Sequence, residues 1–524
     1  MTTSSTFSDR RGIWAFVVGV IAVTAGVLLH MPMFLMGRMT HFRLSGMPMG
    51  ADMYVGMFLI VAGVLVAAYG LLPRRIAQHR AASANVVVAA PEDAQLGLAH
   101  WGLMIVLVLA LVIDVMKPAA LGFAVPGMTQ EYDVPKATAS LVAFFALVGT
   151  VVGSVVWGGL ADIYGRKATI LLSAVLFVGT AICGAMPSLA WNIFMCFMMG
   201  AAAGGMLPVT YALLAEMMPS RHRGWSLVLV GGLGAVGGYF AASGASALWQ
   251  STFSWRILFL LNLPTGLLLV VLGNFIPESA KFLIARGRSE EAKQVMDRFG
   301  AVARKAPVAP KAISGHGALK GVQLWGKLTA LSLAGVCWGL INFGLLLWLP
   351  GNLQERGYSV AVASKLLAES AVIAFPTVFL CALIYTRWST KWSLVTMIGV
   401  TIAGLLLVLK LELSGGSPVL PVALLIVGSN GVLAILLPYC AESFPLRVRG
   451  RTTGWVAACT KAGGVGAQAL SITALVPPMA IVAVAIAVPT AIALGLVAWF
   501  GMETRGRDLR VLDPDGHVFA ATGL

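Results

Sequence analysis

The chain has 524 residues, of which 59% are hydrophobic and only 11% are charged, whereas soluble globular proteins carry about 25% charged residues. This composition excludes a large soluble protein, because such a chain would lack the polar side chains that cover a folded surface. The formal net charge of +15 does not indicate nucleic-acid binding, because the basic residues are spread over short connections between long apolar segments.

Apolar segments of about 20 residues, the length that crosses a bilayer, recur along the whole chain. They predict an all-α integral membrane protein with fourteen spans. The spans are expected at residues 13–29, 55–72, 102–124, 139–161, 168–186, 190–214, 226–247, 256–276, 328–349, 364–385, 393–411, 419–438, 453–474 and 478–500.

The spacing of these spans divides the chain into parts. The first two form a hairpin, and the remaining twelve form two groups of six. The predicted parts are the N-terminal hairpin with a methionine-rich outer loop (1–72), a linker (73–98), a first six-helix half (99–280), a central loop (281–327), a second six-helix half (328–502) and a tail (503–524). Lys and Arg concentrate in alternate connections, which places the linker, the central loop and both termini in the cytoplasm.

Two further patterns bear on the class of protein. Arg10 and Arg11 precede the first span as they would precede a signal peptide, but no small-residue cleavage site ends the span, so we interpret it as an uncleaved anchor. The six cysteines are scattered without CxxC or metal-ligand spacing. No nucleotide-binding loop, metal triad or nucleophile motif is present in the sequence, so neither an enzyme nor a cofactor is expected.

Polar motifs punctuate the connections between the spans. The loop from Gly158 to Lys167 reads GGLADIYGRK, and its glycines allow tight turns and close helix approach. The other motifs are Glu216 to Gly224, Trp255-Arg256, Pro277-Glu278-Ser279, Glu442 to Gly450 and Glu503 to Gly506. In this order they resemble the major facilitator superfamily, and in particular its branch of sugar porters and of proton symporters for phosphate, aromatic acids and other metabolites.

The resemblance implies transport by alternating access, in which two six-helix halves rock around a site at the membrane midplane. It implies a set of conformational motif residues, namely Gly158, Asp162, Gly165, Arg166, Lys167, Glu216, Arg223, Glu442 and Arg449. Asp162 and Arg166 are expected to latch helix ends across the two halves. The chain departs from the family pattern in its second-half loop, Tyr385 to Lys391, which lacks the aspartate and the glycines, and at Cys196, where the superfamily often has arginine.

Asp114 and Lys117 lie inside the first core span, where a charge costs about 2.5–3.5 kcal/mol on insertion scales. They are one helical turn apart on one face, and Pro118 can bend the helix beside them. Aromatic-acid symporters carry Asp-x-x-Asp at a similar place. We hypothesise that an anionic substrate competes for Lys117 and leaves Asp114 free to take a proton. The alternative is a self-neutralising pair that serves helix packing.

Lys461 and Glu369 are the other ionisable candidates within spans. Lys461 precedes Gly463-Gly464, and this segment resembles both the Gly-Lys-x-Gly-Ala of phosphate symporters and the arginine-glycine segment of metabolite symporters. It is expected to bind the substrate anion, with snorkelling to the membrane surface as the alternative. Glu369 lies early in its span, where it acts either as a gate or proton group or as a residue of the outer interface.

Weaker candidates line the expected cavity. Met206 stands where phosphate symporters have an aspartate in Gly-Gly-Asp-Tyr-Pro, which argues against inorganic phosphate. Polar side chains in apolar spans need partners, and most of them only bridge helices. The polar candidates are Tyr211, Asn342, Asn430 and Gln468, with Trp338 and Phe343 as rings that stack on a substrate or simply pack.

The outer loop of the hairpin is rich in methionine, with Met33, Met36 and Met39 between His30 and His41. Thioether and imidazole ligands favour Cu(I), which gives a hypothesis of a different class. The alternative is an apolar patch that packs on the flank of the transporter, and the positive charge of Arg38 and Arg43 disfavours a cation.

Together these patterns predict a secondary active transporter of a small organic anion, a mono- or dicarboxylate that is aromatic or aliphatic. The coupling ion is expected to be H⁺, and the protein is expected to be a monomer among the lipids of a bacterial-type cytoplasmic (inner) membrane. The alternatives are a sugar or polyol porter, and a copper-handling or non-transporting sensor protein.

Overall fold

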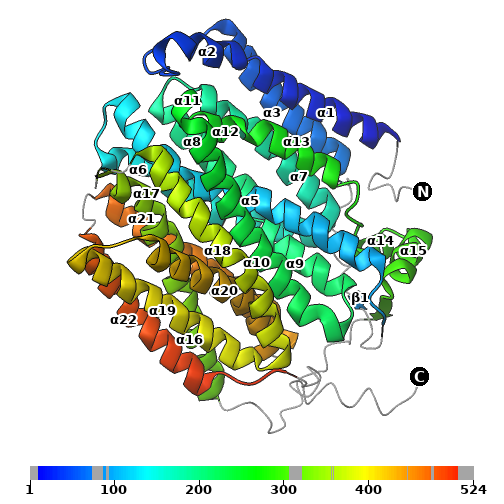
Figure 1. Ribbon diagram of the computed structural model, residues 1–524. Helices are drawn as coiled ribbons and strands as arrows, with labels where there is room; N and C mark the ends of the chain where they lie inside the picture. The colour runs from blue at the N-terminus through cyan, green and yellow to red at the C-terminus, as the bar shows by residue number, and fades with distance from the viewer. Residues whose placement is uncertain are drawn as a thin grey trace, which may run out of the picture. The chain divides into compact units, whose positions relative to one another are not determined.

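The protein is almost entirely helical, as expected for apolar segments that must satisfy their backbone hydrogen bonds within the membrane. A computed structural model describes residues 10–72, 86–89, 94–305, 321–355, 357, 359–444, 446–473 and 477–505. Among these residues, ten helices are long and apolar enough to cross a membrane, and three shorter apolar helices accompany them (Figure 1).

The helices and strands follow one another in the following chain order. Before the central loop they are α1 (Arg10–Leu28), α2 (Met31–Met36), η1 (Gly37–Thr40), α3 (Ala51–Leu71), β1 (Val86–Ala89), α5 (Leu98–Tyr132), α6 (Lys136–Tyr164), α7 (Arg166–Gly179), η2 (Thr180–Ala185), α8 (Leu189–Ala203), α9 (Met206–Met217), α10 (Ser220–Ala245), η3 (Ser246–Gln250), α11 (Ser251–Phe253), α12 (Ile257–Leu260), α13 (Asn262–Leu272), α14 (Ala280–Ala285), α15 (Ser289–Phe299) and β2 (Val302–Lys305). After it come α16 (Gly321–Leu340), η4 (Ile341–Leu345), α17 (Leu346–Glu355), α18 (Val360–Arg387), α19 (Thr390–Ser414), α20 (Val419–Ser443), α21 (Leu446–Ile472) and α22 (Met479–Phe500).

Internal contacts divide the chain into two compact units, each with its own core. The first unit comprises residues 1–223, 237–307 and 349–365, and the second comprises 224–236, 308–348 and 366–524, in each case as far as the structure describes them. Helices of the first unit pack chiefly as α1 with α3 and α6 with α8, and those of the second as α19 with α20 and α22, and α16 with α21.

Local sequence explains where the helices depart from the predicted spans. The segment predicted at 190–214 breaks into α8 and α9 at Gly204-Gly205, where the Trp157 side chain packs so closely that a Cβ on Gly205 would overlap it. The segment predicted at 328–349 contains a π-helical turn, η4. Helix α21 is not among the ten membrane-crossing candidates, because its polar and basic residues, Lys461 among them, dilute its apolar character.

Helices α1 and α3 form a tightly packed hairpin in the first unit (dark blue in Figure 1). A Cβ atom on Gly19 would lie 2.6 Å from the Gly63 carbonyl oxygen, and one on Gly26 would lie 2.6 Å from the Gly56 oxygen. These glycines therefore let the two backbones touch, as small residues do between membrane helices. The hairpin then packs through apolar residues of both helices on α7.

The loop between α1 and α3 is hydrogen-bonded to a buried carboxylate of α5, that of Glu131 at the end of the helix. Its Oε1 accepts hydrogen bonds from the backbone N–H groups of Leu44 (2.7 Å) and Ser45 (3.2 Å), and from Arg256 Nη2 at 2.6 Å. Its Oε2 accepts from Trp255 Nε1 at 2.9 Å. The Arg256 side chain is fully buried, so Glu131 supplies the counter-charge that this guanidinium needs.

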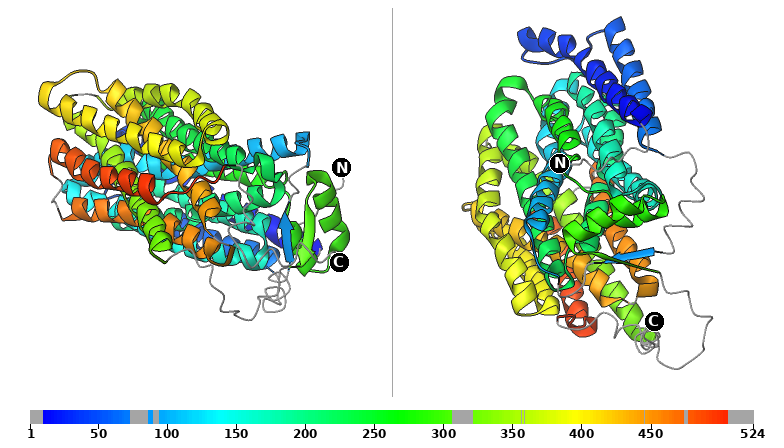
Figure 2. Two further views of the ribbon diagram at one scale, coloured as in Figure 1. Left: turned by 90° about the horizontal axis from the view of Figure 1, so that it is seen from below. Right: turned by 90° about the vertical axis from the view of Figure 1, so that its right-hand side faces the viewer.

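A small antiparallel sheet, absent from the predicted all-α fold, joins two connecting segments of the first unit (Figure 2). Strand β1 of the linker pairs with β2 of the central loop, with Val86 opposite Lys305. Beside it, His100 Nδ1 accepts a hydrogen bond from the Gly97 N–H (3.0 Å), which leaves Nε2 to donate to the Phe299 carbonyl (3.2 Å). The beginning of α5 is thus held against the end of α15.

Substitution of Glu131 by alanine tests the fastening of the hairpin. Removing the carboxylate leaves the Arg256 charge buried and uncompensated, so we expect a loss of about 3–5 kcal/mol in the free energy of unfolding. The matched control is Glu291→Ala, which breaks a partly exposed pair with Arg288 and is expected to cost less than about 1 kcal/mol. Thermal unfolding of the purified variants measures both, and equal shifts in Tm would contradict the proposed role.

Candidate substrate and coupling site

Helix α5 carries the central charged pair of the first unit. Lys117 is 2% exposed, and its Nζ has no hydrogen-bond partner among the described residues. The ammonium group lies over the ring of Phe177 from α7, a cation–π contact. Asp114 lies one turn earlier, is half-buried, and interacts favourably with the Lys117 charge. The structure therefore brings Asp114 and Lys117 together and leaves the cation without a hydrogen bond.

Lys117 also lines a small cavity within the first unit. Pro118 of α5, Thr150 of α6 and Met199 of α8 line the same cavity. It has room for about one water molecule. Binding of an organic anion at the ammonium group therefore requires the surrounding side chains, Phe177 among them, to move.

Helix α9 supplies two more buried polar atoms to the first unit. The hydroxyl groups of Thr210 and Tyr211 have no hydrogen-bond partner among the described residues, and α9 packs on α5. Met206 is buried at the start of α9. A buried polar group without a partner costs about 1–3 kcal/mol, so these hydroxyls are candidates for contact with a ligand or an ordered water.

In the second unit the cavity candidates gather around the π-helical turn η4. Asn342 Nδ2 donates to the Trp338 carbonyl (3.1 Å), and the rings of Trp338 and Phe343 meet edge to face at 5.6 Å. Gln468 Nε2 of α21 donates to the Phe343 carbonyl. A π-turn disturbs the regular helical hydrogen bonds and often marks a functional position. Gln468 thus bridges α21 and η4, whereas Asn342 bonds a carbonyl one turn earlier in its own helix.

Lys461 is half-buried and lies on α21, the helix that packs against this turn. Gly463 and Gly464 follow it, and a Cβ on Gly463 would overlap the Val336 carbonyl oxygen of α16. The glycines thus allow α16 and α21 to approach closely beside Lys461. Asn430 on α20 is buried, and its Nδ2 has no hydrogen-bond partner among the described residues, whereas Glu369 on α18 is exposed.

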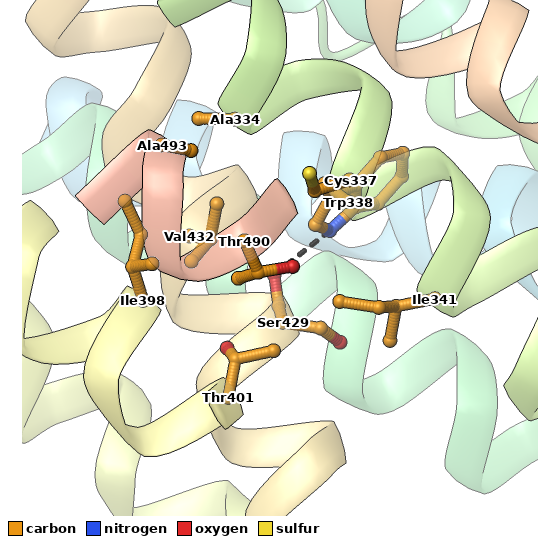
Figure 3. A pocket seen from close by; sticks show the side chains of 10 residues that line it. All are labelled: Ala334, Cys337, Trp338, Ile341, Ile398, Thr401, Ser429, Val432, Thr490 and Ala493. Carbon is orange, nitrogen blue, oxygen red and sulfur yellow. Dashed lines mark hydrogen bonds between the residues drawn. The ribbon is translucent and has the colours of Figure 1, made fainter. Parts of the chain in front are cut away.

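A second small cavity lies in the second unit, between α16, α19, α20 and α22 (Figure 3). Trp338 lines it and donates from Nε1 to the Ser429 carbonyl at 2.8 Å, and Thr401 and Thr490 add hydroxyl groups. The Ser429 hydroxyl has no hydrogen-bond partner in the described structure. The space again suits about one water molecule, so an organic substrate does not fit in this cavity without movement of its lining.

The conformational motif residues of the first unit make contacts with two carboxylates, Glu216 and Glu278. Arg166 forms an ion pair with Glu216 at 2.8 Å. Glu278 accepts hydrogen bonds from the backbone N–H group of Lys167 at the beginning of α7 (3.3 Å) and from that of Ser279, which directly precedes α14 (2.9 Å). The Ser279 hydroxyl donates to Glu216 at 3.0 Å and links the two carboxylates.

Gly165 makes this arrangement possible. Its φ of +95° lies in the region that favours glycine, and a Cβ there would lie 2.5 Å from Glu278 Oε1. Burial raises the pKa of Glu278, although hydrogen bonds to backbone N–H groups and the charges of Lys167 and Arg166 oppose that rise.

The second unit repeats this arrangement with different residues. Glu503 accepts from the backbone N–H groups of Thr390 and Arg505, each at 3.0 Å, and from the Ser389 hydroxyl at the beginning of α19. The Thr504 hydroxyl donates to Glu442 at 3.0 Å, as Ser279 does to Glu216. The loop that lacks the family's aspartate and glycines is therefore still held by a carboxylate at a helix N-terminus.

Other motif residues lie as follows. Arg166, expected to latch the two halves together, pairs with Glu216 of its own unit. Arg223 is half-buried on α10. Gly158 and Asp162 belong to α6 and Arg449 belongs to α21, but their side-chain environment lies outside the described residues. Cys196, in place of the family's arginine, is buried with its Sγ 3.6 Å from Cys183 Sγ.

The sequence reasoning missed three features of this site. Phe177, which covers the Lys117 ammonium group, is one of many apolar residues in its span, and nothing in the sequence singles it out. Glu131 stands at the end of α5 and was detectable only as an acid facing the Trp255-Arg256 motif. Thr210 lies beside the predicted Tyr211, but hydroxyl residues are common in membrane helices.

These features define a multi-pass membrane transporter, and comparison with known proteins identifies its family. The family model described as Major Facilitator Superfamily matches residues 103–468. The chain therefore belongs to the Major Facilitator Superfamily. The α1–α3 hairpin precedes the matched residues.

Curated relatives and solved structures agree with this assignment. The chain is similar to the niacin transporter NiaP of Acinetobacter baylyi, with 26% identity over 73% of this chain and 88% of the relative. It is also similar to the 4-hydroxybenzoate transporter PcaK of the same organism, with 29% identity over 52% of this chain and 63% of the relative. The xylose transporter XylE from E. coli, in a partially occluded inward-open conformation, superposes with a TM-score of 0.61 at 17% identity, over 79% of this chain and 100% of XylE.

Substitution of Glu503 by glutamine tests the helix-start arrangement of the second unit. Burial raises the pKa of Glu503, but hydrogen bonds from Ser389 and Thr390 outweigh it and hold the pKa below its ordinary value. An acid with a lowered folded-state pKa stabilises the protein above its unfolded pKa of about 4.3 and loses that contribution as the pH falls. We therefore expect the variant to have a lower Tm than the wild type at pH 7, with the gap closing below about pH 4.

The matched control for this measurement is Glu290→Gln, at an exposed position on α15. Its Tm is expected to follow the wild type across the pH range. A gap between Glu503→Gln and the wild type that stays constant from pH 7 to pH 3 would show that the carboxylate charge does not matter.

Proposed function

We propose that the protein is a secondary active transporter that moves a small organic anion, an aromatic carboxylate in the first instance, by alternating access. The relatives are named as transporters of niacin and of 4-hydroxybenzoate, and a benzoate transport protein is 25% identical over 70% of this chain. Each of these substrates is a small aromatic carboxylic acid. The observation that carries the proposal is the buried Lys117 ammonium group, which lacks a hydrogen-bond partner in the described structure.

The chemistry of Lys117 suits an aromatic carboxylate. An ammonium group binds a carboxylate through a charge-assisted hydrogen bond, which is about twice as strong as a neutral one. The Phe177 ring that now lies against Nζ offers a face on which a substrate ring can stack. An incoming anion thus gives the cation the hydrogen bond that it lacks among the described residues. Lys461 of the second unit is proposed as a further group for the anion.

Asp114 is the proposed proton carrier. While Lys117 faces it, the cation stabilises the carboxylate. When a substrate anion takes up the Lys117 charge, that stabilisation falls and Asp114 binds a proton more readily. Substrate and proton are then taken up together, which is symport. Glu369 is proposed as an outer gate or proton group, with Tyr211, Asn430 and the residues around η4 as the polar lining of the path.

The proposed topology has fourteen spans, with both termini in the cytoplasm and the α1–α3 hairpin added before two six-helix halves. The basic connections of the sequence support this orientation. The proposed location is the bacterial inner membrane, with the protein acting as a monomer among lipids. The likeness to a xylose transporter concerns the fold alone, and no contact of the described residues favours a sugar over an anion.

Replacing Lys117 by glutamine tests substrate recognition. Loss of a charged hydrogen bond is worth about 1.5–3 kcal/mol, so the apparent affinity for benzoate is expected to fall about 10- to 100-fold. The measurement is counterflow of labelled benzoate and nicotinate in proteoliposomes, with xylose and phosphate as comparison solutes. Lys461→Gln is expected to weaken uptake in the same direction.

The matched control is Lys293→Gln, which removes an exposed lysine on α15 and is expected to leave counterflow unchanged. Wild-type counterflow of xylose but not of any carboxylate would refute the proposed substrate class. Benzoate counterflow that is equal in the wild type and in Lys117→Gln would keep the substrate class and refute the proposed site.

Asp114→Asn separates coupling from substrate movement. Without a titratable carboxyl group the protein is expected to exchange benzoate across the membrane but to lose accumulation driven by an inward pH gradient. The two rates are compared in the same proteoliposomes with and without the gradient. Gradient-driven accumulation at the wild-type level in Asp114→Asn would assign coupling to another residue.

A further inference from the structure

His30 is a buried imidazole with one free lone pair. It follows α1 in the first unit and is 1% exposed. Its Nδ1 lies 2.7 Å from the Gly26 carbonyl oxygen. Because a carbonyl only accepts, Nδ1 must carry the proton, and Nε2 is left as an unprotonated nitrogen. That nitrogen is buried and has no hydrogen-bond partner among the described residues.

This is the state of a histidine prepared to bind a metal ion. Metal-ligating histidines almost always donate their other ring N–H to a carbonyl or carboxylate, which fixes the tautomer and the orientation of the ring. The Gly26 carbonyl does this for His30. Gly56 packs against the same edge of the ring, since a Cβ there would lie 2.6 Å from His30 Cε1 and 2.8 Å from His30 Nδ1. An empty lone pair in this place costs about 1–3 kcal/mol.

Two buried thioethers belong to the same part of the hairpin. Met33 is one helical turn after His30 and is 4% exposed. Met53 is one turn before Gly56, against which His30 packs, and lies on the same buried face of α3. Both belong to one packed cluster that also contains Met186. The sulfur atoms are therefore supplied by the helices that enclose the imidazole.

We propose that His30 Nε2, Met33 and Met53 form a binding site for Cu(I). Thioether sulfur and neutral imidazole are the ligands that select this soft ion. Hard cations such as Mg²⁺ and Ca²⁺ require oxygen ligands, and no group of three or more His, Cys, Asp or Glu residues that could hold a metal was found among the described residues. The site is distinct from the anion site proposed on α5.

The ligands of this proposed metal site differ from those expected from the sequence. Met36 and Met39 are 61% and 92% exposed, and His41 is exposed as well. Arg38 and Arg43 are also exposed, so water screens their charge from the buried ligands. The partly buried Met47 and Met49 pack against the same cluster and mark a route by which a soft ion enters from the loop.

The test is Cu(I) binding to the purified, reduced full-length protein in competition with the chelator bicinchoninate. The wild type is expected to retain one Cu(I) that the double variant Met33→Leu/Met53→Leu does not, with at least a tenfold loss of affinity. These changes nearly conserve side-chain volume, so the hairpin is expected to stay folded. His30→Gln is expected to weaken binding similarly, and X-ray absorption of the loaded wild type is expected to show both nitrogen and sulfur ligands.

The matched control is Met36→Leu/Met39→Leu, which removes two exposed thioethers and is expected to bind Cu(I) as the wild type does. The six cysteines are buried, and any Cu(I) that they take up would be common to all variants. Equal binding in the wild type and in both Met33→Leu/Met53→Leu and His30→Gln would overturn the proposal. Loss of binding in the control alone would assign copper to the exposed loop instead, which also overturns it.

Discussion

Burial of charge is the constraint on which most of the specific contacts in this protein depend. A charged group taken out of water must find a counter-charge or several hydrogen bonds, or it destabilises the fold by several kcal/mol. Arg256 forms an ion pair with Glu131, and Arg166 forms one with Glu216. Glu503 accepts a backbone hydrogen bond at the beginning of α19. Lys117 differs from these groups, because its ammonium group lies beside an aromatic ring and a carboxylate but has no hydrogen bond within the part of the chain that the structure describes. The paired charges hold the helices together, and Lys117 is for this reason the proposed position for a ligand.

The same arrangement of carboxylates and hydrogen bonds occurs twice, once in each unit. In both, a carboxylate accepts an N–H group from the first turn of a helix, and the following hydroxyl residue donates to a second carboxylate. These residues are Glu278 and Ser279 in one unit and Glu503 and Thr504 in the other. This repetition supports the proposed transporter of two related halves, in which both halves would hold their connecting loops through a conformational change. The second unit preserves the interaction although its loop lacks the family's aspartate and glycines.

The sequence predicts the helical framework because long apolar segments have few other stable structures in a membrane. It also identifies Asp114 and Lys117, since charges at bilayer depth are conspicuous. It does not reveal the β1–β2 pair, since short strands in polar connections carry no distinct periodicity. Nor does it reveal that Phe177 covers Lys117 or that Leu44 and Ser45 bind Glu131, because these contacts join positions far apart in the chain. The methionine-rich loop shows the same limit, since burial of Met33 and exposure of Met39 follow from helix packing.

The most direct test of the account is equilibrium binding of benzoate to the purified protein, measured for the wild type and for Lys117→Gln by the rise in apparent stability that a bound ligand produces. Benzoate is expected to stabilise the wild type, and in the variant this effect is expected to be lost or to require about 10- to 100-fold more benzoate. Equal stabilisation of both proteins by benzoate would contradict the central claim that the buried Lys117 ammonium group receives the substrate anion.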